Sequence, residues 1–201
     1  MVTGAVAAIG SFDGVHRGHR FLIAETEKLA ISVGAPVGAV VFDPHPRRFF
    51  QPEAPPFLIT LPATRDAGLA AMTPDAFVRE ILKARLGLSG VVAGAEFRFG
   101  KARAGDGEGL KRLCAAEGMS AHLAAPLADD SHAEKISSTA VRAAIAAGDM
   151  RSAARLLGRI WSVGGVVSKG RELGRTIGFA TANLTLGALI EPRRGVYAVR
   201  A

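Results

Sequence analysis

The sequence predicts an α/β protein in which a parallel sheet covered by helices is followed by a small antiparallel β domain, a barrel. Two observations carry this prediction. Residues 1–150 alternate short apolar runs with stretches of helical periodicity, which is typical of β-α units. From Arg159 onward the chain is rich in glycine and has short apolar runs, which is typical of a small β domain. We therefore expect two domains, spanning residues 1–157 and 158–201.

The expected elements follow one another along the chain. Apolar runs predict strands in the first domain, the first two of them buried, over residues 5–12, 36–44, 90–94 and 120–127. Helical spacing predicts helices over residues 17–34, 73–87, 109–118, 138–148 and 150–158. The helix at residue 73 has the clearest start, because Thr73 suits the N-cap and Pro74 the first helical position. The second domain has strand-like runs at residues 160–168, 176–186 and 195–201.

The composition indicates a folded protein without membrane spans or disulfides. Hydrophobic residues make up 49% of the 201 residues and charged residues 21%, which suits a packed core. Charged residues interrupt every apolar run before it reaches the length of a membrane span, and the N-terminus lacks the basic region of a signal peptide. The single cysteine, Cys114, lies in a helical pattern and is expected in the core. We expect a cytoplasmic protein.

The charge is distributed unevenly. Residues 1–150 carry 16 basic and 16 acidic residues, so the net charge of +7 comes from residues 151–201, which carry 9 basic and 2 acidic residues. Such an asymmetry favours an anionic partner for the C-terminal part, either nucleic acid or polyphosphate. A merely solvated basic face is the alternative.

The segment GSFDGVHRGH, residues 10–19, follows the first predicted strand and begins the first helix. Backbone N–H groups at a helix start attract phosphate, and Gly14 and Gly18 permit its close approach. His16 and His19 are three residues apart, so on a helix both imidazoles share one face and can donate to a phosphate. One of them can instead be purely structural. A two-histidine metal site is less favoured, since Asp13 is the one candidate third ligand nearby.

The segment KISSTAVR, residues 135–142, opens a second helix suited to phosphate. It offers free amide groups, a cation and three hydroxyl groups, which together can hold a triphosphate. Capping of the helix alone also explains the hydroxyl groups. The residues concerned are Ser137, Ser138, Thr139 and Arg142. Two such helix starts in one α/β domain indicate an enzyme that handles nucleotides.

These motifs resemble those of a known family. GSFDGVHRGH is similar to the HxGH-type motif of the nucleotidyltransferase superfamily, and KISSTAVR is similar to its ISSTxxR motif. With VVFDPHPRRFF, AEFRFGKARAGD and GRELGRTIGFATANL, the five blocks resemble the bacterial bifunctional riboflavin kinases/FMN adenylyltransferases over nearly the whole chain. The resemblance implies a Rossmann-like nucleotidyltransferase domain followed by part of a riboflavin kinase barrel.

The resemblance also implies the chemistry. ATP phosphorylates riboflavin to FMN in the kinase domain, and the first domain transfers AMP from a second ATP to FMN, which yields FAD and pyrophosphate. Mg²⁺ would bridge phosphate oxygens and keep several waters. His16, His19 and Arg142 are the implied catalytic residues, and Arg142 would hold the phosphates that leave. The implied ATP-binding residues are Gly10, Ser11, Phe12, Gly14, Gly18, Ser137, Ser138 and Thr139.

The flavin side of the site is implied by two further blocks. In FDPHPRRFF the two prolines are expected to fix an extended turn, and Phe49 offers an apolar face for a ring or else packs in the core. Glu96 stands where the family usually has Asp or Asn, and residues 57–72 are too short for the helix and strand that the family has there. The implied flavin-binding residues are Asp43, His45, Pro46, Arg47, Phe49, Glu96 and Phe97.

The kinase signature supplies the last predicted residues. Thr181 and Asn183, two apart in an extended segment, would face the same way and hold Mg²⁺ and phosphate. The family has Pro where this chain has Ala180. The implied phosphate loop also contains Gly170, Gly174 and Arg175. The family's glutamate base would lie beyond residue 201, so we expect these 201 residues to make FAD from FMN but not FMN from riboflavin.

Two other functions remain open on the sequence. A related nucleotidyltransferase, making a coenzyme A precursor or a CDP-alcohol, would share both helix-start motifs. A non-catalytic module that binds nucleotide or RNA would account for the basic C-terminal part but not for the histidines. We expect small-molecule substrates, ATP and flavins, no nucleic acid, no membrane and a monomer.

Overall fold

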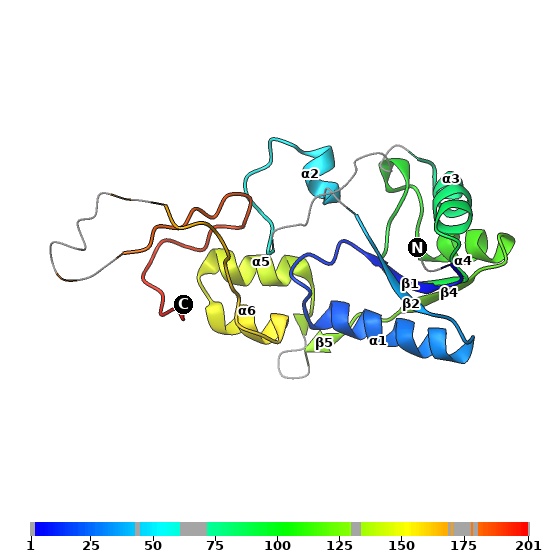
Figure 1. Cartoon of the computed structure of the whole chain (residues 1–201), viewed down its shortest axis with the longest axis horizontal. Coiled ribbons are helices and arrows are strands. Elements are labelled where there is room, and N and C mark those ends of the chain that lie inside the picture. The colour runs from blue at the N-terminus through cyan, green and yellow to red at the C-terminus, as the bar shows by residue number, and fades with distance from the viewer. Residues whose placement is uncertain are drawn as a thin grey trace.

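A computed structural model describes residues 3–42, 45–60, 72–129, 134–168, 170, 178 and 181–200. The N-terminal part is built on a four-stranded parallel sheet with the strand order β2-β1-β3-β4 (Figure 1). Each strand predicted in residues 1–157 is present, whereas the runs predicted as strands at residues 160–168, 176–186 and 195–201 form no strand among the residues described there. The strands are β1 (Val6–Gly10), β2 (Val37–Val41), β3 (Gly90–Gly94) and β4 (Ser120–Ala124). The predicted α/β fold with a parallel sheet is confirmed.

Helices cover both faces of the sheet because alternate strand residues point to opposite sides. Val6, Ala8 and Val92 pack against α1 (Arg17–Ser32) on one face. Ala7, Ile9, Val91 and Ala93 face the other side, where the helix of residues 74–85 and α4 (Gly107–Ala116) lie. Cys114 of α4 is buried in this second layer, as the sequence predicts.

The helix predicted over residues 73–87 begins as expected and then departs from regular geometry. Thr73 caps it through a hydrogen bond from the Ala76 amide, and α3 (Pro74–Ala76) runs directly into a π-helix, η2 (Phe77–Arg85). The Leu86 amide donates to the Ile81 carbonyl, five residues back. All four apolar residues of the π-helix that face the sheet are buried, namely Phe77, Val78, Ile81 and Leu82.

The prediction that the second strand is buried is wrong. Val37 and Val41 are exposed, because β2 is the edge strand and pairs only with β1. An apolar run of five residues suits a strand at any place in a sheet, so the pattern could not place it at the edge. The two strands in the centre, β1 and β3, are the buried ones.

Two short helices follow the sheet. They are α5 (Ser138–Ala147) and α6 (Met150–Leu157), which end at Gly148 and Gly158 in the left-handed conformation that glycine favours. They enclose their own cluster around Ile145, Leu156 and Leu157. A hairpin of β5 (Ala128–Asp129) and β6 (Glu134–Lys135) comes before them.

The C-terminal part, from residue 158 on, runs out from the helical pair (Figure 1). In the residues described there it has no strand longer than a bridge, and its one antiparallel pairing joins Ser168 to Asn183. A strand is held by its neighbours, and one pairing does not make a ladder. Leu189 packs against Phe57 and Leu58 and pairs with Leu58, which attaches this part to the first domain.

Parts of several predictions lie outside the described residues. These include Asp43, most of the 57–72 segment, and Gly174 and Arg175. Among the helices of the described part, none is long and apolar enough to cross a membrane.

Candidate active site

A cavity of about 1240 Å³ opens where the parallel strands end. The last residues of all four strands line it, namely Gly10, Val41, Gly94 and Ala124, together with the starts of α1 and α5. This is where ligands bind in open α/β sheets. The predicted position of the site beyond the carboxyl ends of the strands therefore coincides with a cavity.

The two histidines of the first motif lie side by side in this cavity. His16 is the N-cap of α1, and its Nδ1 accepts a hydrogen bond from the His19 amide at 3.3 Å. The two rings stack with centroids 3.7 Å apart and planes 17° apart. Because Nδ1 of His16 is an acceptor, its proton is on Nε2, which leaves an N–H group to donate. Nδ1 of His19 is buried and finds no partner among the described residues.

Both imidazoles are neutral near neutral pH. Burial lowers the pKa of His16 to about 4, although the Asp13 carboxylate opposes this shift. The pKa of His19 is lowered to about 3, chiefly by burial and also by the neighbouring His16 and Arg142. In the free protein the pair therefore offers neutral N–H donors to a phosphate, and not the positive charge of imidazolium.

These shifts predict that acid destabilises the protein through the histidine pair. As pH falls from 6.5 toward about 3, the unfolded chain protonates His19 while the folded chain does not, so the free energy of unfolding falls. His19→Gln removes this contribution. Denaturant titrations over this pH range should show the variant gaining stability relative to wild type as pH falls. Parallel stability curves for the two proteins would contradict the neutral state.

The two glycines of the first motif have different surroundings. Gly18 lines the cavity, and a Cβ there would lie 3.1 Å from the His16 ring and from the Ile136 carbonyl. Gly14 has φ +82°, and its missing Cβ faces Ile59, whose Cγ2 would be 2.8 Å away. Gly18 is thus the glycine at the ligand side, and Gly14 allows the turn to pack against residue 59.

Gly14→Ala should destabilise the protein more than Gly34→Ala does. Both glycines have positive φ, but a Cβ on Gly34 meets nothing within 4 Å. Gly34→Ala therefore carries only the cost of the left-handed conformation, about 1 kcal/mol. The contact with Ile59 should add about 1–3 kcal/mol for Gly14→Ala. Equal losses in denaturant unfolding would show that residue 14 is not tightly packed.

The second motif divides between two hollows. Ser137 caps α5 by accepting from the Ala140 amide at 3.2 Å, and Ser137 and Ser138 line the main cavity. Thr139 and Arg142 line a smaller hollow of about 380 Å³, together with Arg47 and Phe57. Arg142, which was predicted to bind phosphate together with Ser137 and Ser138, therefore lies in the smaller hollow and not in the main cavity.

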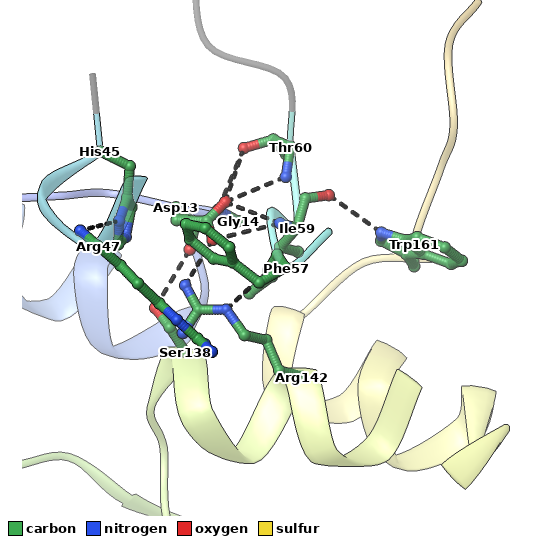
Figure 2. A network of polar contacts seen from close by, with 10 residues as sticks. All are labelled: Asp13, Gly14, His45, Arg47, Phe57, Ile59, Thr60, Ser138, Arg142 and Trp161. Carbon is green, nitrogen blue, oxygen red and sulfur yellow. Dashed lines mark hydrogen bonds and ion pairs between the residues drawn. The ribbon is translucent and has the colours of Figure 1, made fainter. Parts of the chain in front are cut away.

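Arg142 is bound on two sides in this smaller hollow. Its Nη2 forms an ion pair with the Asp13 carboxylate at 2.7 Å, and its Nε donates to the Phe57 carbonyl at 2.9 Å (Figure 2). Sequence reasoning considered Asp13 only as a metal ligand and missed this pair. The sequence did contain one signal for this ion pair, because the first motif contains an acidic residue and the second an arginine.

The predicted flavin-side residues that the structure describes lie in the main cavity or next to it. His45, Pro46, Arg47, Glu96 and Phe97 line the cavity. The predicted extended turn is wrong: His45 accepts from the Arg47 amide and caps a short helix, α2 (Pro46–Phe50), with Pro46 at a position that favours a helix start. Phe49 is in this helix. Asp43 lies outside the described residues.

Aromatic rings that the sequence did not single out complete an aromatic wall of the cavity. The rings of Phe97 and Phe99 stack with their centroids 5.5 Å apart. The centroids of the Phe99 and Phe77 rings are 5.8 Å apart. Phe77 and Phe99 line the cavity although they come from distant segments. Glu96 forms an ion pair with Lys135 on the cavity rim.

Of the residues predicted to bind ATP at the end of β1, Gly10 and Ser11 line the cavity. Phe12 does not line it, and its ring contacts the His19 ring with centroids 5.1 Å apart.

The predicted kinase residues lie apart, in the C-terminal part. Thr181 and Asn183 are exposed, and Asn183 pairs with Ser168. A Cβ on Gly170 would collide with the Asn183 amide at 2.2 Å, so these two segments are in close contact. Among the residues that the structure describes, no group of three His, Cys, Asp or Glu could hold a metal ion.

Comparisons with known proteins match both parts of the chain. A family model for FAD synthetase matches residues 2–140, and one for riboflavin kinase matches residues 157–201. Relatives named bifunctional riboflavin kinase/FMN adenylyltransferase occur in Pseudomonas fluorescens, at 37% identity over 98% of this chain and 68% of the relative. The protein of that name from Escherichia coli K12 is 35% identical over 98% of this chain and 67% of its own.

A solved structure from Streptococcus pneumoniae has the same fold. It is titled a macrolide-efflux protein and has a TM-score of 0.82 at 30% identity, covering 97% of this chain and 68% of that one. The similarity between this chain and that protein is one of fold.

Proposed function

This chain belongs to the bifunctional riboflavin kinase/FMN adenylyltransferase family, and we propose that its residues 1–157 transfer AMP from ATP to FMN. The observation that carries the proposal is the stacked pair of neutral histidines at the start of α1, inside the cavity at the strand ends. A phosphate oxygen of FMN attacks the α-phosphorus of ATP. The bond to the β-phosphate oxygen breaks, and FAD and pyrophosphate are formed.

The size of the cavity suits two substrates. Ligand pockets are usually about 300–1,000 Å³, and this cavity of about 1240 Å³ is larger. ATP would place its phosphates between the starts of α1 and α5, where the backbone N–H groups of the first helical turns are available. The flavin ring would lie along Phe97, which is half-buried in the cavity and stacks on the buried Phe99.

The protein's own contribution to the reaction is positioning and stabilisation of charge. No covalent intermediate with the protein is needed, so no nucleophile is required. His16 and His19 would donate N–H bonds to the phosphate oxygens on which negative charge develops. Gly18 leaves room for these oxygens beside the His16 ring, and Arg47 at the rim would attract the phosphate of FMN.

Reactions of this kind use Mg²⁺, which neutralises phosphate charge when it is bound. The described residues hold no cluster of acidic or histidine ligands, so in the first domain the cation would be held by phosphate oxygens and water. In the C-terminal part, the Thr181 hydroxyl and the Asn183 carbonyl are oxygen donors of the kind that Mg²⁺ prefers. We propose that these two residues, with Gly170, Gly174 and Arg175, serve ATP-dependent phosphorylation of riboflavin.

We further propose that the protein works as a cytoplasmic monomer on small molecules. The excess of positive charge in residues 151–201 then serves polyphosphate and not nucleic acid. An electrophoretic mobility assay with RNA and duplex DNA tests whether the protein binds nucleic acid, and no shift is expected at physiological salt.

The proposed reaction is tested by incubating the protein with ATP and Mg²⁺ and one acceptor at a time. With FMN, chromatography should detect FAD by its flavin fluorescence. With 4′-phosphopantetheine, or with CTP and a phosphorylated alcohol in place of ATP and FMN, no product should form. A product from either alternative acceptor, without FAD from FMN, would assign the site to another nucleotidyltransferase.

A further inference from the structure

A buried carboxylate joins three separate segments of the chain beside the histidine pair. Asp13 lies between β1 and α1 and is 5% exposed. Its Oδ1 accepts from the amides of Ile59 and Thr60 at 2.9 and 3.1 Å, and its Oδ2 pairs with Arg142 at 2.7 Å (Figure 2). One side chain thus holds the segment of residues 57–60 and helix α5 at the same point.

The backbone of Asp13 strengthens this junction. Its carbonyl accepts from the Ser138 hydroxyl at 3.3 Å, and Ser138 lines the main cavity. Arg142, one helical turn further on, also donates to the Phe57 carbonyl, which links α5 to the 57–60 segment directly. The start of α5 is therefore fixed to the turn that carries His16 by two contacts with one residue.

Asp13 does not reach the cavity itself. It is not among the residues that line either hollow in the described part of the chain, although Ser11 and His16 line the main cavity. A group that contacts Arg142, Ser138 and the histidine turn without contacting the cavity acts through these neighbours. Active sites need such support, because a displacement of about 1 Å can cost on the order of a hundredfold in rate.

We propose that Asp13 is a positioning residue for adenylyl transfer, which holds the start of α5 and the 57–60 segment in register with His16 and His19. This proposal rests on the proposed function of the cavity. The two phosphate-binding helix starts come from segments more than a hundred residues apart, and the Asp13–Arg142 pair spans 129 positions. The distance between the two helix starts depends on contacts between them and not on the sequence of either helix, and Asp13 provides such contacts.

Two substitutions separate the two attachments of Asp13. In Asp13→Asn the side-chain carbonyl oxygen can still accept from Ile59 and Thr60, but the neutral amide cannot form an ion pair with Arg142. This variant therefore breaks the ion pair with Arg142, whose Nε can still donate to the Phe57 carbonyl, and keeps the side-chain contact with the 57–60 segment. Asp13→Ala removes both side-chain contacts. Asp75→Asn is the matched control, because Asp75 pairs with Arg79 at 2.9 Å on the exposed surface of α3.

The single tryptophan reports on the 57–60 segment. Nε1 of Trp161 donates to the Ile59 carbonyl at 3.1 Å (Figure 2), and the chain has one Trp. Its emission should match that of wild type in Asp13→Asn and shift to the red in Asp13→Ala. This readout needs no substrate, so it remains informative if the protein does not make FAD, a result that would overturn the proposed function separately.

The proposal is tested by steady-state FAD formation in these variants. Asp13→Asn should lower kcat on the order of tenfold or more while the KM for FMN stays the same, and Asp75→Asn should match wild type. Combining Asp13→Asn with Arg142→Met should cost no more than Arg142→Met alone, because methionine has no charge with which residue 13 could pair. Wild-type kcat in Asp13→Asn, with unchanged Trp161 emission, would overturn the proposal. Additive losses in the double variant would also overturn it.

Discussion

Replacing His19 with alanine should lower the rate of FAD formation on the order of a hundredfold, while FMN binds as tightly as before. The reason is the place of the ring. His19 lies in the main cavity, stacked on His16, and at neutral pH it carries a neutral ring with a pKa of about 3. Its effect is therefore expected where charge develops on phosphate and not where the flavin ring lies. Single-turnover rates and FMN titrations by flavin fluorescence measure the two effects separately.

Two further variants make this result interpretable. His122→Ala removes a histidine of β4 that pairs with Glu25 on the surface, and it should leave the rate unchanged. His19→Gln retains an N–H donor of similar reach, so it should recover part of the activity that alanine loses. A His19→Ala protein with wild-type turnover would remove the histidine pair from the mechanism.

Replacing Arg142 with lysine should lower activity about tenfold or more although the positive charge is kept. Arg142 donates through Nε to the Phe57 carbonyl and through Nη2 to Asp13 at the same time. A lysine has one nitrogen on a flexible stem and cannot reproduce this planar, two-sided contact. We expect the loss mainly in kcat, with the start of α5 displaced. ATP saturation curves for both proteins separate kcat from KM.

A second arginine provides the control for this substitution. Arg79 makes exposed pairs with Asp75 and Glu80 on the helix surface, so Arg79→Lys should match wild type. Lysine is as good a helix former as arginine, so a loss confined to Arg142→Lys cannot come from helix propensity. Unchanged kinetics in Arg142→Lys would mean that the two-sided contact has no part in the reaction.

The sequence predicted what local patterns determine. The histidine motif lies at the start of a helix because His16 caps it, and Thr73 caps its helix as expected. Ser137 caps α5, which the sequence offered as the alternative to phosphate binding. Capping and periodicity involve neighbours within one or two turns, so they can be recognised without the fold. Both helix starts that line the main cavity were predicted in this way.

The features that the sequence missed depend on partners far along the chain. The strand order, which decides that β2 is exposed, is not encoded in the run of apolar residues that forms it. The Asp13–Arg142 pair joins two motifs that were each interpreted alone. The aromatic wall takes Phe77 from a helix and Phe99 from a loop. In each case the information lies in tertiary contacts, which periodicity does not carry.

The central claim is that the histidine cavity joins AMP to FMN. The most direct measurement is the initial rate at which wild type, with FMN, ATP and Mg²⁺, releases FAD and pyrophosphate together. We predict equal amounts of the two products from wild type and a rate reduced on the order of a hundredfold in His19→Ala. Pyrophosphate without FAD, or equal FAD formation by the two proteins, would contradict the account.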